Sequence, residues 1–135
     1  MYTGSCLCKG IMFEIHQAIE HIFVCHCVEC QKAQGSAFVA VVTIEKDQFK
    51  MVKGKEKLTE YYSSPLKRRV FCQTCGSPIF SARDDLPEVY RLRAGLIDQK
   101  LHAQIYSHAY LSECVSWMNF DVQNTLAFQY AVTHK

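Results

Sequence analysis

Seven of the eight cysteines in this 135-residue chain fall into three tight clusters. The clusters are Cys6-Leu7-Cys8, Cys25-His26-Cys27-Val28-Glu29-Cys30 and Cys72-Gln73-Thr74-Cys75. Thiols spaced by one or two residues are typical of metal ligands. Structural zinc sites use four protein ligands, whereas catalytic zinc sites use three and keep one position open. The spacing therefore predicts one four-thiol site, made by the two shorter clusters, and one three-thiol site.

The two shorter clusters predict a closed, structural zinc site. Cys6 and Cys8 lie two residues apart, so on a strand both thiols would point to the same face. Cys72-x-x-Cys75-Gly76 has the spacing of a zinc knuckle, and Gly76 suits its turn because glycine tolerates a positive φ. We expect a structural zinc bound by Cys6, Cys8, Cys72 and Cys75. The alternatives are four unconnected buried cysteines, or iron in place of zinc.

The three-thiol cluster predicts a second zinc with an open position. Cys25 and Cys27 would share a strand face, and Cys27 and Cys30 lie three apart at the start of an expected helix. The helix N-terminus would stabilise thiolates through its positive potential and free amides. An open zinc can polarise a carbonyl or bind and deprotonate a thiol. We therefore expect Cys25, Cys27 and Cys30 to be catalytic and to hold this zinc.

Other interpretations of the three-thiol cluster stay open. Cys114, His102 or His108 would close the site as a fourth ligand, whereas alternation points His26 to the opposite strand face. A redox role for Cys27-x-x-Cys30 is a further alternative, although no thioredoxin-like βαβ pattern surrounds it. Disulfides are disfavoured, because neighbours on a strand rarely meet the geometry of a bridge.

The segments around the cysteines predict a mainly β protein built from short antiparallel strands. One clear helix is expected over Val28–Gln34, with Gly35 as its C-terminal stop. A short turn is expected at 45–49, and the stretch 125–132 is ambiguous between helix and coil. Apolar and β-branched runs predict the strands, at 12–16, 22–25, 37–44, 58–62, 69–72, 78–81, 89–94 and 104–106.

Length and composition fit a single domain over residues 1–135, with 49% hydrophobic and 21% charged residues. A net charge of +2 is too small to indicate nucleic acid or a membrane surface as a partner. The sequence contains no apolar run of about 20 residues, so we expect no membrane span, and its first residues do not predict a secretory signal. We expect a cytoplasmic location, where thiols stay reduced.

The motifs together resemble those of the glutathione-dependent formaldehyde-activating enzyme family, over nearly the whole chain. The motifs are Gly4-Ser5-Cys6-Leu7-Cys8, Cys25-His26-Cys27-x-x-Cys30 with Lys32 and Gly35-Ser36-Ala37-Phe38, Phe71-Cys72-x-x-Cys75-Gly76-Ser77, Gly95-Leu96-Ile97-Asp98 and Trp117. Gln31 stands where many members carry a basic residue, and Cys114 lies outside the pattern, where we expect it to be a small buried apolar residue.

This resemblance implies folded-over antiparallel β-sheets, a fold shared with a small zinc-containing guanine-nucleotide-exchange chaperone. It implies two zinc ions per chain, structural at the four-thiol site and catalytic at the three-thiol site. The implied reaction adds the sulfur of glutathione to formaldehyde, giving S-hydroxymethylglutathione, and is classed as that of a carbon–sulfur lyase. The partners would be a glutathione-like thiol and a small aldehyde. We expect Lys32, Ser36 and Arg69 to bind the substrate.

Two other functions fit the same motifs. A non-catalytic zinc module of this fold would bind a protein partner, because a fold alone does not fix a function. A zinc or thiol stress sensor would release metal when the open cluster is oxidised.

Overall fold

The computed structural model describes residues 1–131, and its contacts divide the chain into two compact units. The first unit is Met1–Ile19 with Val42–Leu101, and the second is Glu20–Val41 with the chain from His102 onward. The chain passes from the second unit to the first within strand β4 (Val39–Glu45). Each unit is described by itself, and the expected single domain over residues 1–135 stays a prediction.

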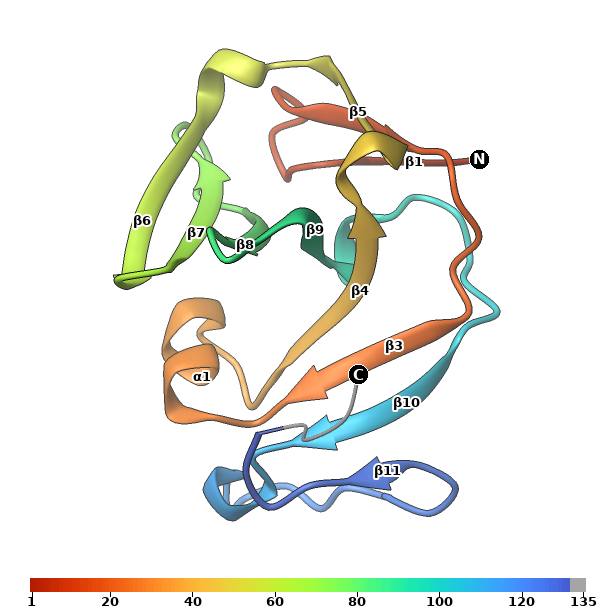
Figure 1. The fold of residues 1–135 in the computed structure, drawn as a ribbon, viewed down its shortest axis with the longest axis vertical. Helices are drawn as coiled ribbons and strands as arrows, with labels where there is room; N and C mark the ends of the chain where they lie inside the picture. The colour runs from red at the N-terminus through yellow and green to blue at the C-terminus, as the bar shows by residue number, and fades with distance from the viewer. Residues whose placement is uncertain (132–135) are drawn as a thin grey trace. The chain divides into compact units, whose positions relative to one another are not determined.

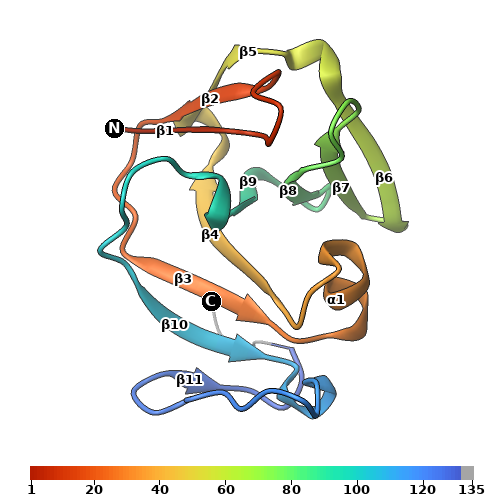
Figure 2. The ribbon, with the colours of Figure 1, turned by 180° about the vertical axis from the view of Figure 1, so that it is seen from behind.

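The first unit contains a small antiparallel sheet of three strands in the order β1-β2-β5, seen together in Figure 2. These strands are β1 (Tyr2–Ser5), β2 (Met12–Ile15) and β5 (Phe49–Lys53). Alternation along β2 buries Phe13 and Ile15. The Phe13 ring packs against Phe49 with ring centroids 5.1 Å apart, so an aromatic pair joins β2 to β5.

Four further strands of the first unit form an antiparallel meander in the order β6-β7-β8-β9. They are β6 (Leu58–Ser64), β7 (Lys67–Cys72), β8 (Pro78–Arg83) and β9 (Leu86–Arg93). Val70, Phe80 and Leu92 face one another across the strands and are buried. The 3-10 helices of this unit are η1 (Lys46–Gln48), η2 (Lys55–Lys57) and η3 (Ala94–Leu96). This meander positions the pair Cys72 and Cys75, because β7 ends at Cys72.

The second unit is built on the strand order β11-β10-β3-β4. Strand β3 (His21–Cys25) leads directly to helix α1 (Val28–Gln34), and β10 (Gln104–Ala109) lies beside β3 (Figure 1). The short 3-10 helix η4 (Leu111–Glu113) follows β10, and β11 (Leu126–Ala127) pairs with β10. β10 runs parallel to both β3 and β11, so the expectation of antiparallel strands alone is too simple.

The mainly β class is confirmed, and the helix begins and ends where the sequence predicts. Gly35 follows α1 with φ 61°, a left-handed conformation that glycine adopts without strain. Each expected strand is present, with ends that differ by a few residues, while β1, β5 and β11 were not predicted. Residues 125–131 are a short strand and bends, not a helix, and Val132 lies outside the described residues. Among the helices of residues 1–131, none is long and apolar enough to cross a membrane.

Candidate metal centres

Cys6, Cys8, Cys72 and Cys75 converge within the first unit and form the four-thiol cluster, whose sulfur atoms all lie within 4.8 Å of one another. The Cys6 and Cys8 sulfurs are 3.6 Å apart, and the Cys8 and Cys72 sulfurs are 3.9 Å apart. The structure thus brings together all four residues expected at the structural site. A set of four thiolate donors with this spacing fits a tetrahedral zinc ion.

The route by which Cys6 and Cys8 converge differs from the expected one. They do not alternate along a strand, because β1 ends at Ser5 and the chain turns. The Lys9 N–H donates to the Cys6 carbonyl at 3.1 Å, and Lys9 has a φ of 61°. The Cys6 N–H then donates to the Ile11 carbonyl at 3.1 Å. A tight loop, not a pleated strand, therefore aims both thiols at one point.

Backbone amides point at the sulfurs of the four-thiol cluster. The Gly10 N–H donates to Cys8 Sγ at 3.4 Å, and the Ile11 N–H donates to Cys6 Sγ at 3.3 Å. In the knuckle, the Thr74 N–H donates to Cys72 Sγ at 3.4 Å. The Gly76 N–H closes that turn on the Cys72 carbonyl at 2.8 Å. Such donors favour the thiolate form that binds a metal.

The pKa values of Cys75 and Cys8 shift in opposite directions. A hydrogen bond with Ser77 lowers the pKa of Cys75 to about 5. For Cys8 the Gly10 amide lowers the pKa, but neighbouring thiols, Cys6 first, outweigh it and raise the pKa to about 11. Crowded thiols resist losing all their protons unless a cation compensates the charge. A divalent metal supplies that compensation, so the cluster has the chemistry of a metal site.

Cys25, Cys27 and Cys30 converge within the second unit and form the three-thiol cluster, again with all sulfurs within 4.8 Å. Cys25 is the last residue of β3, and Cys27 is the N-cap of α1 in an extended conformation, with φ −63° and ψ 151°. The Cys30 N–H donates to Cys27 Sγ at 3.3 Å. The helix start therefore supplies both a thiol and an amide, as the sequence predicts.

None of the three alternative fourth ligands joins the three-thiol cluster among the described residues of the second unit. Cys114 and His102 are exposed, and His108 is buried with its Nδ1 bonded to His26. The expectation that Cys114 is a buried apolar residue is wrong, because it follows η4 at the surface. The described residues of this unit therefore offer three ligands at this cluster.

In the absence of metal, the pKa values of the Cys25 and Cys27 thiols are raised, which favours their protonated forms. The hydrogen bond with Cys30, followed by burial, raises the pKa of Cys25. Burial raises the pKa of Cys27 despite the amide of Cys30, which lowers it. Cys30 itself is only 4% exposed. Metal binding here must release protons, so affinity for a metal rises with pH.

His26 does not join the three-thiol cluster, and its ring contacts His108 instead. It is fully buried, and its Nε2 and His108 Nδ1 are 2.8 Å apart. Burial lowers the pKa of both rings, and the neighbouring His108 lowers that of His26 further. Two neutral imidazoles can share one hydrogen in this way, because one ring donates and the other accepts.

The three residues expected to bind the substrate lie in different settings. Lys32 and Ser36 are exposed in the second unit, on α1 and directly after its Gly35 cap. The Ser36 N–H donates to the Gln31 carbonyl at 3.2 Å, so its backbone completes the helix end. Arg69 lies on β7 of the first unit and is 8% exposed. Their role in binding stays a prediction.

Gln31 and Glu113 make hydrogen bonds that hold helix α1 and that the sequence did not indicate. Gln31 Nε2 donates to the carbonyls of His26, at 2.7 Å, and Glu113, at 2.8 Å. The Val28 N–H donates to Glu113 Oε1 at 2.9 Å, which caps the first turn of α1. Glu113 is 85 residues from Val28, so no local pattern could have paired them. These bonds fix the helix that carries Cys30.

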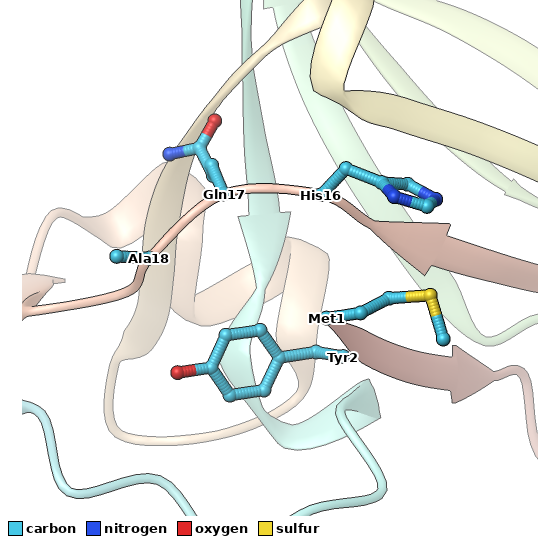
Figure 3. Close-up of a pocket in the computed structure, with 5 residues that line it drawn as sticks. All are labelled: Met1, Tyr2, His16, Gln17 and Ala18. Carbon is cyan, nitrogen blue, oxygen red and sulfur yellow. The ribbon is translucent and has the colours of Figure 1, made fainter.

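A pocket of about 600 Å³ lies elsewhere in the first unit (Figure 3). Its lining residues are Met1, Tyr2, His16, Gln17 and Ala18. It contains no cysteine and none of the residues expected to bind substrate. The candidate chemistry therefore rests on the two thiol clusters and not on this pocket.

The protein is rich in β-strands and has one four-thiol and one three-thiol cluster, each of which could hold a metal ion. The chain belongs to the glutathione-dependent formaldehyde-activating enzyme family, whose model matches residues 1–113 and therefore all seven clustered cysteines. A protein of Schizosaccharomyces pombe described as an uncharacterized lyase is 30% identical over 95 residues, which are 70% of this chain and 67% of that protein. A crystal structure of a Rhodobacter sphaeroides protein matches with a TM-score of 0.62 and 23% identity, over 74% of this chain and 91% of that one. The structural match shows the same fold.

Proposed function

We propose that this protein is a zinc-dependent carbon–sulfur lyase that joins a thiol such as glutathione to formaldehyde or a related small aldehyde. Family membership and the lyase description of the yeast relative support lyase chemistry. The observation that carries the proposal is the three-thiol cluster, to which the described residues of its own unit add no fourth ligand. In this proposal, Cys25, Cys27 and Cys30 hold a catalytic zinc, and the four-thiol cluster holds a structural one.

The reaction balances without an oxidant or reductant. The thiol sulfur forms a bond to the carbonyl carbon, the carbonyl π bond breaks, and the thiol proton ends on the carbonyl oxygen. When bound at the three-thiol cluster, zinc would lower the pKa of an incoming thiol or polarise the aldehyde. The reaction is reversible, which accounts for the name lyase in the direction of breakdown.

The residues of the chain would contribute position and charge. The Cys30 amide stabilises the Cys27 thiolate, and the start of α1 adds positive potential beside it. Three thiolates overcompensate the charge of Zn²⁺, so cations favour the binding of a further thiolate. Lys32 follows Cys30 closely on α1 and is the exposed cation of this helix. We propose that Lys32 and Ser36, in the same unit as the three-thiol cluster, bind anionic and polar groups of the substrate. A binding role for Arg69 of the first unit stays a prediction from the sequence.

The test compares Cys27→Ser with Cys114→Ser, an exposed cysteine of the same unit that lies outside both clusters. We expect two zinc ions per chain in the parent and in Cys114→Ser, and one in Cys27→Ser. With glutathione and formaldehyde, the rate of adduct formation above the spontaneous rate should persist in the control. It should fall by at least about 100-fold in Cys27→Ser, because the zinc ligand set is broken.

A protein that carries two zinc ions but gives no rate above the spontaneous reaction, with glutathione or with other small thiols, would contradict the proposal. That result would favour the non-catalytic zinc module. Because the uncatalysed reaction is itself fast, the rate is best followed by exchange between free and adduct signals at equilibrium in NMR spectra.

A further inference from the structure

His26, which lies between Cys25 and Cys27 in the sequence, has a buried side chain that makes specific contacts of its own. Its side chain is 0% exposed, and that of its partner His108 is 3% exposed. The two rings stack with centroids 5.1 Å apart and planes 19° apart, and Nε2 of His26 lies 2.8 Å from Nδ1 of His108. The bond joins residues 82 positions apart in the sequence, so it is a tertiary contact.

Two phenylalanines enclose this imidazole pair. The Phe120 ring stands edge-on to His26 with centroids 4.5 Å apart, and Phe38 lies at 5.9 Å. Phe120 and Phe38 also contact each other, at 5.8 Å. Among residues 1–131, the outer nitrogens, Nδ1 of His26 and Nε2 of His108, have no hydrogen-bond partner. The mutual bond is therefore the one polar contact that each buried ring makes within the described chain.

The backbone of His26 is fixed at both of its polar groups. Its N–H donates to the Ala109 carbonyl at 3.0 Å, and its carbonyl accepts the Gln31 side chain at 2.7 Å. The peptide units on either side of His26 carry the Cα atoms of Cys25 and Cys27. Fixing the backbone and the ring of His26 therefore fixes the positions of the Cα atoms from which both thiol side chains extend.

We propose that His26 and His108 are a positioning pair that holds the Cys25 and Cys27 thiols in metal-binding geometry, with Phe120 as the wall that keeps the pair in place. The inference rests on the proposed metal site at the three-thiol cluster. Phe120 lies beyond residues 1–113, which the family model matches, so its contact with His26 is made by a residue outside the matched region. Contacts around metal ligands commonly change metal affinity by about 10- to 100-fold.

The decisive variant is His108→Phe, which keeps an aromatic ring beside His26 but removes the hydrogen bond. His102→Phe is the control, because His102 is an exposed histidine of the same unit. Zinc-loaded protein is mixed with an excess of a chelating dye, and the two phases of zinc release are assigned with Cys27→Ser. We expect His108→Phe to speed release from the three-thiol cluster by about 10- to 100-fold and to leave the four-thiol phase unchanged. His108→Gln, which can restore a bond to His26, should recover most of the difference.

A second readout does not depend on metal. Amide hydrogen exchange in the peptide spanning residues 25–31 should speed up by about 10-fold in His108→Phe, zinc-loaded or zinc-free, and stay unchanged in His102→Phe. Absence of zinc from the parent three-thiol cluster would overturn the proposed function, while the exchange measurement still decides the role of the pair.

The proposal is overturned if His108→Phe matches His102→Phe in both zinc release and exchange. It is also overturned if both zinc phases accelerate equally, because the pair would then act only on general stability. Should His108→Phe fail to fold, Phe120→Leu loosens the enclosure without leaving a polar group unpaired. Selective release from the three-thiol cluster in Phe120→Leu supports the proposal, and parent-like release rules it out.

Discussion

Several thiols of both clusters receive amide hydrogen bonds from close neighbours in the sequence. The Gly10, Thr74 and Cys30 amides each donate to a sulfur two or three residues away. The groups that hold the helix in place, by contrast, come from far along the chain, as Gln31 and Glu113 show. At the scale of single residues, local turns thus supply hydrogen bonds to the sulfur atoms, and distant contacts fix the helix that carries Cys30.

Replacing Gln31 by Met tests whether the hydrogen bonds of its side chain hold helix α1 in place. The change keeps length and helix propensity but leaves two carbonyls, those of His26 and Glu113, without the donor they have now. We expect the free energy of unfolding of the second unit to fall by about 1–3 kcal/mol. Lys32→Met is the matched control, since Lys32 is an exposed neighbour on α1 and should change stability by less than about 0.5 kcal/mol. Equal denaturant midpoints for the two variants would show that the Gln31 bonds contribute nothing.

At the scale of elements, the loop after β1 depends on a close backbone approach. Gly54 has a φ of 83°, and a Cβ at this position would lie 2.0 Å from the Gly10 carbonyl oxygen. Gly10 belongs to the loop that presents Cys6 and Cys8, and its N–H donates to Cys8 Sγ. The turn between β5 and η2 therefore supports the four-thiol cluster without contributing a ligand.

The Gly54→Ala variant isolates this contact when it is compared with Gly35→Ala. Both glycines have a positive φ, but a Cβ at Gly35 would meet nothing within 4 Å. We expect Gly35→Ala to cost about 1 kcal/mol from backbone strain alone. Gly54→Ala should cost about 2–4 kcal/mol, because the clash with Gly10 adds to the strain. Zinc release from the four-thiol cluster should also accelerate only in Gly54→Ala; similar losses in both variants would show that the loop absorbs the clash.

The sequence predicted those elements whose signals are local. Residues 28–34 were predicted as a helix because a short helical run is followed directly by a glycine stop. β1 was missed because Tyr2–Ser5 has no apolar alternation and contains Gly4, a residue type depleted in strands. Its pairing with β2 defines it. The same limit applies to the candidate site. Cysteine spacing indicated all seven clustered thiols, but nothing near His26 indicated His108 or Phe120 as its neighbours. The parallel pairing of β3 with β10 brings His108 to His26.

At the scale of the whole molecule, each compact unit contains one thiol cluster. The four-thiol cluster joins residues as far apart as Cys8 and Cys72, which are separated by 64 positions. A cross-link over so long a loop removes much conformational freedom from the unfolded chain. The three-thiol cluster spans only Cys25 to Cys30, so a metal there closes almost no loop. The same metal is therefore expected to act mainly on stability in the first unit and mainly on chemistry in the second.

Metal removal should separate these two roles. Structural zinc sites bind with an apparent free energy of about 10–16 kcal/mol, comparable to the 5–15 kcal/mol by which a whole domain is stable. We expect a chelator to strip the three-thiol cluster first, abolishing adduct turnover while the β-sheet circular dichroism stays unchanged. Removal of the second zinc should then unfold the first unit, which would be seen as fast amide exchange across β7 and β8.

A variant of the four-thiol cluster tests the structural role directly. In Cys8→Ser, the first unit should unfold at lower denaturant even with zinc present. Cys114→Ser should behave as the parent, because its thiol is exposed and belongs to neither cluster. A zinc-free protein with the parent's denaturant midpoint would show that the four thiols pack without any need for metal.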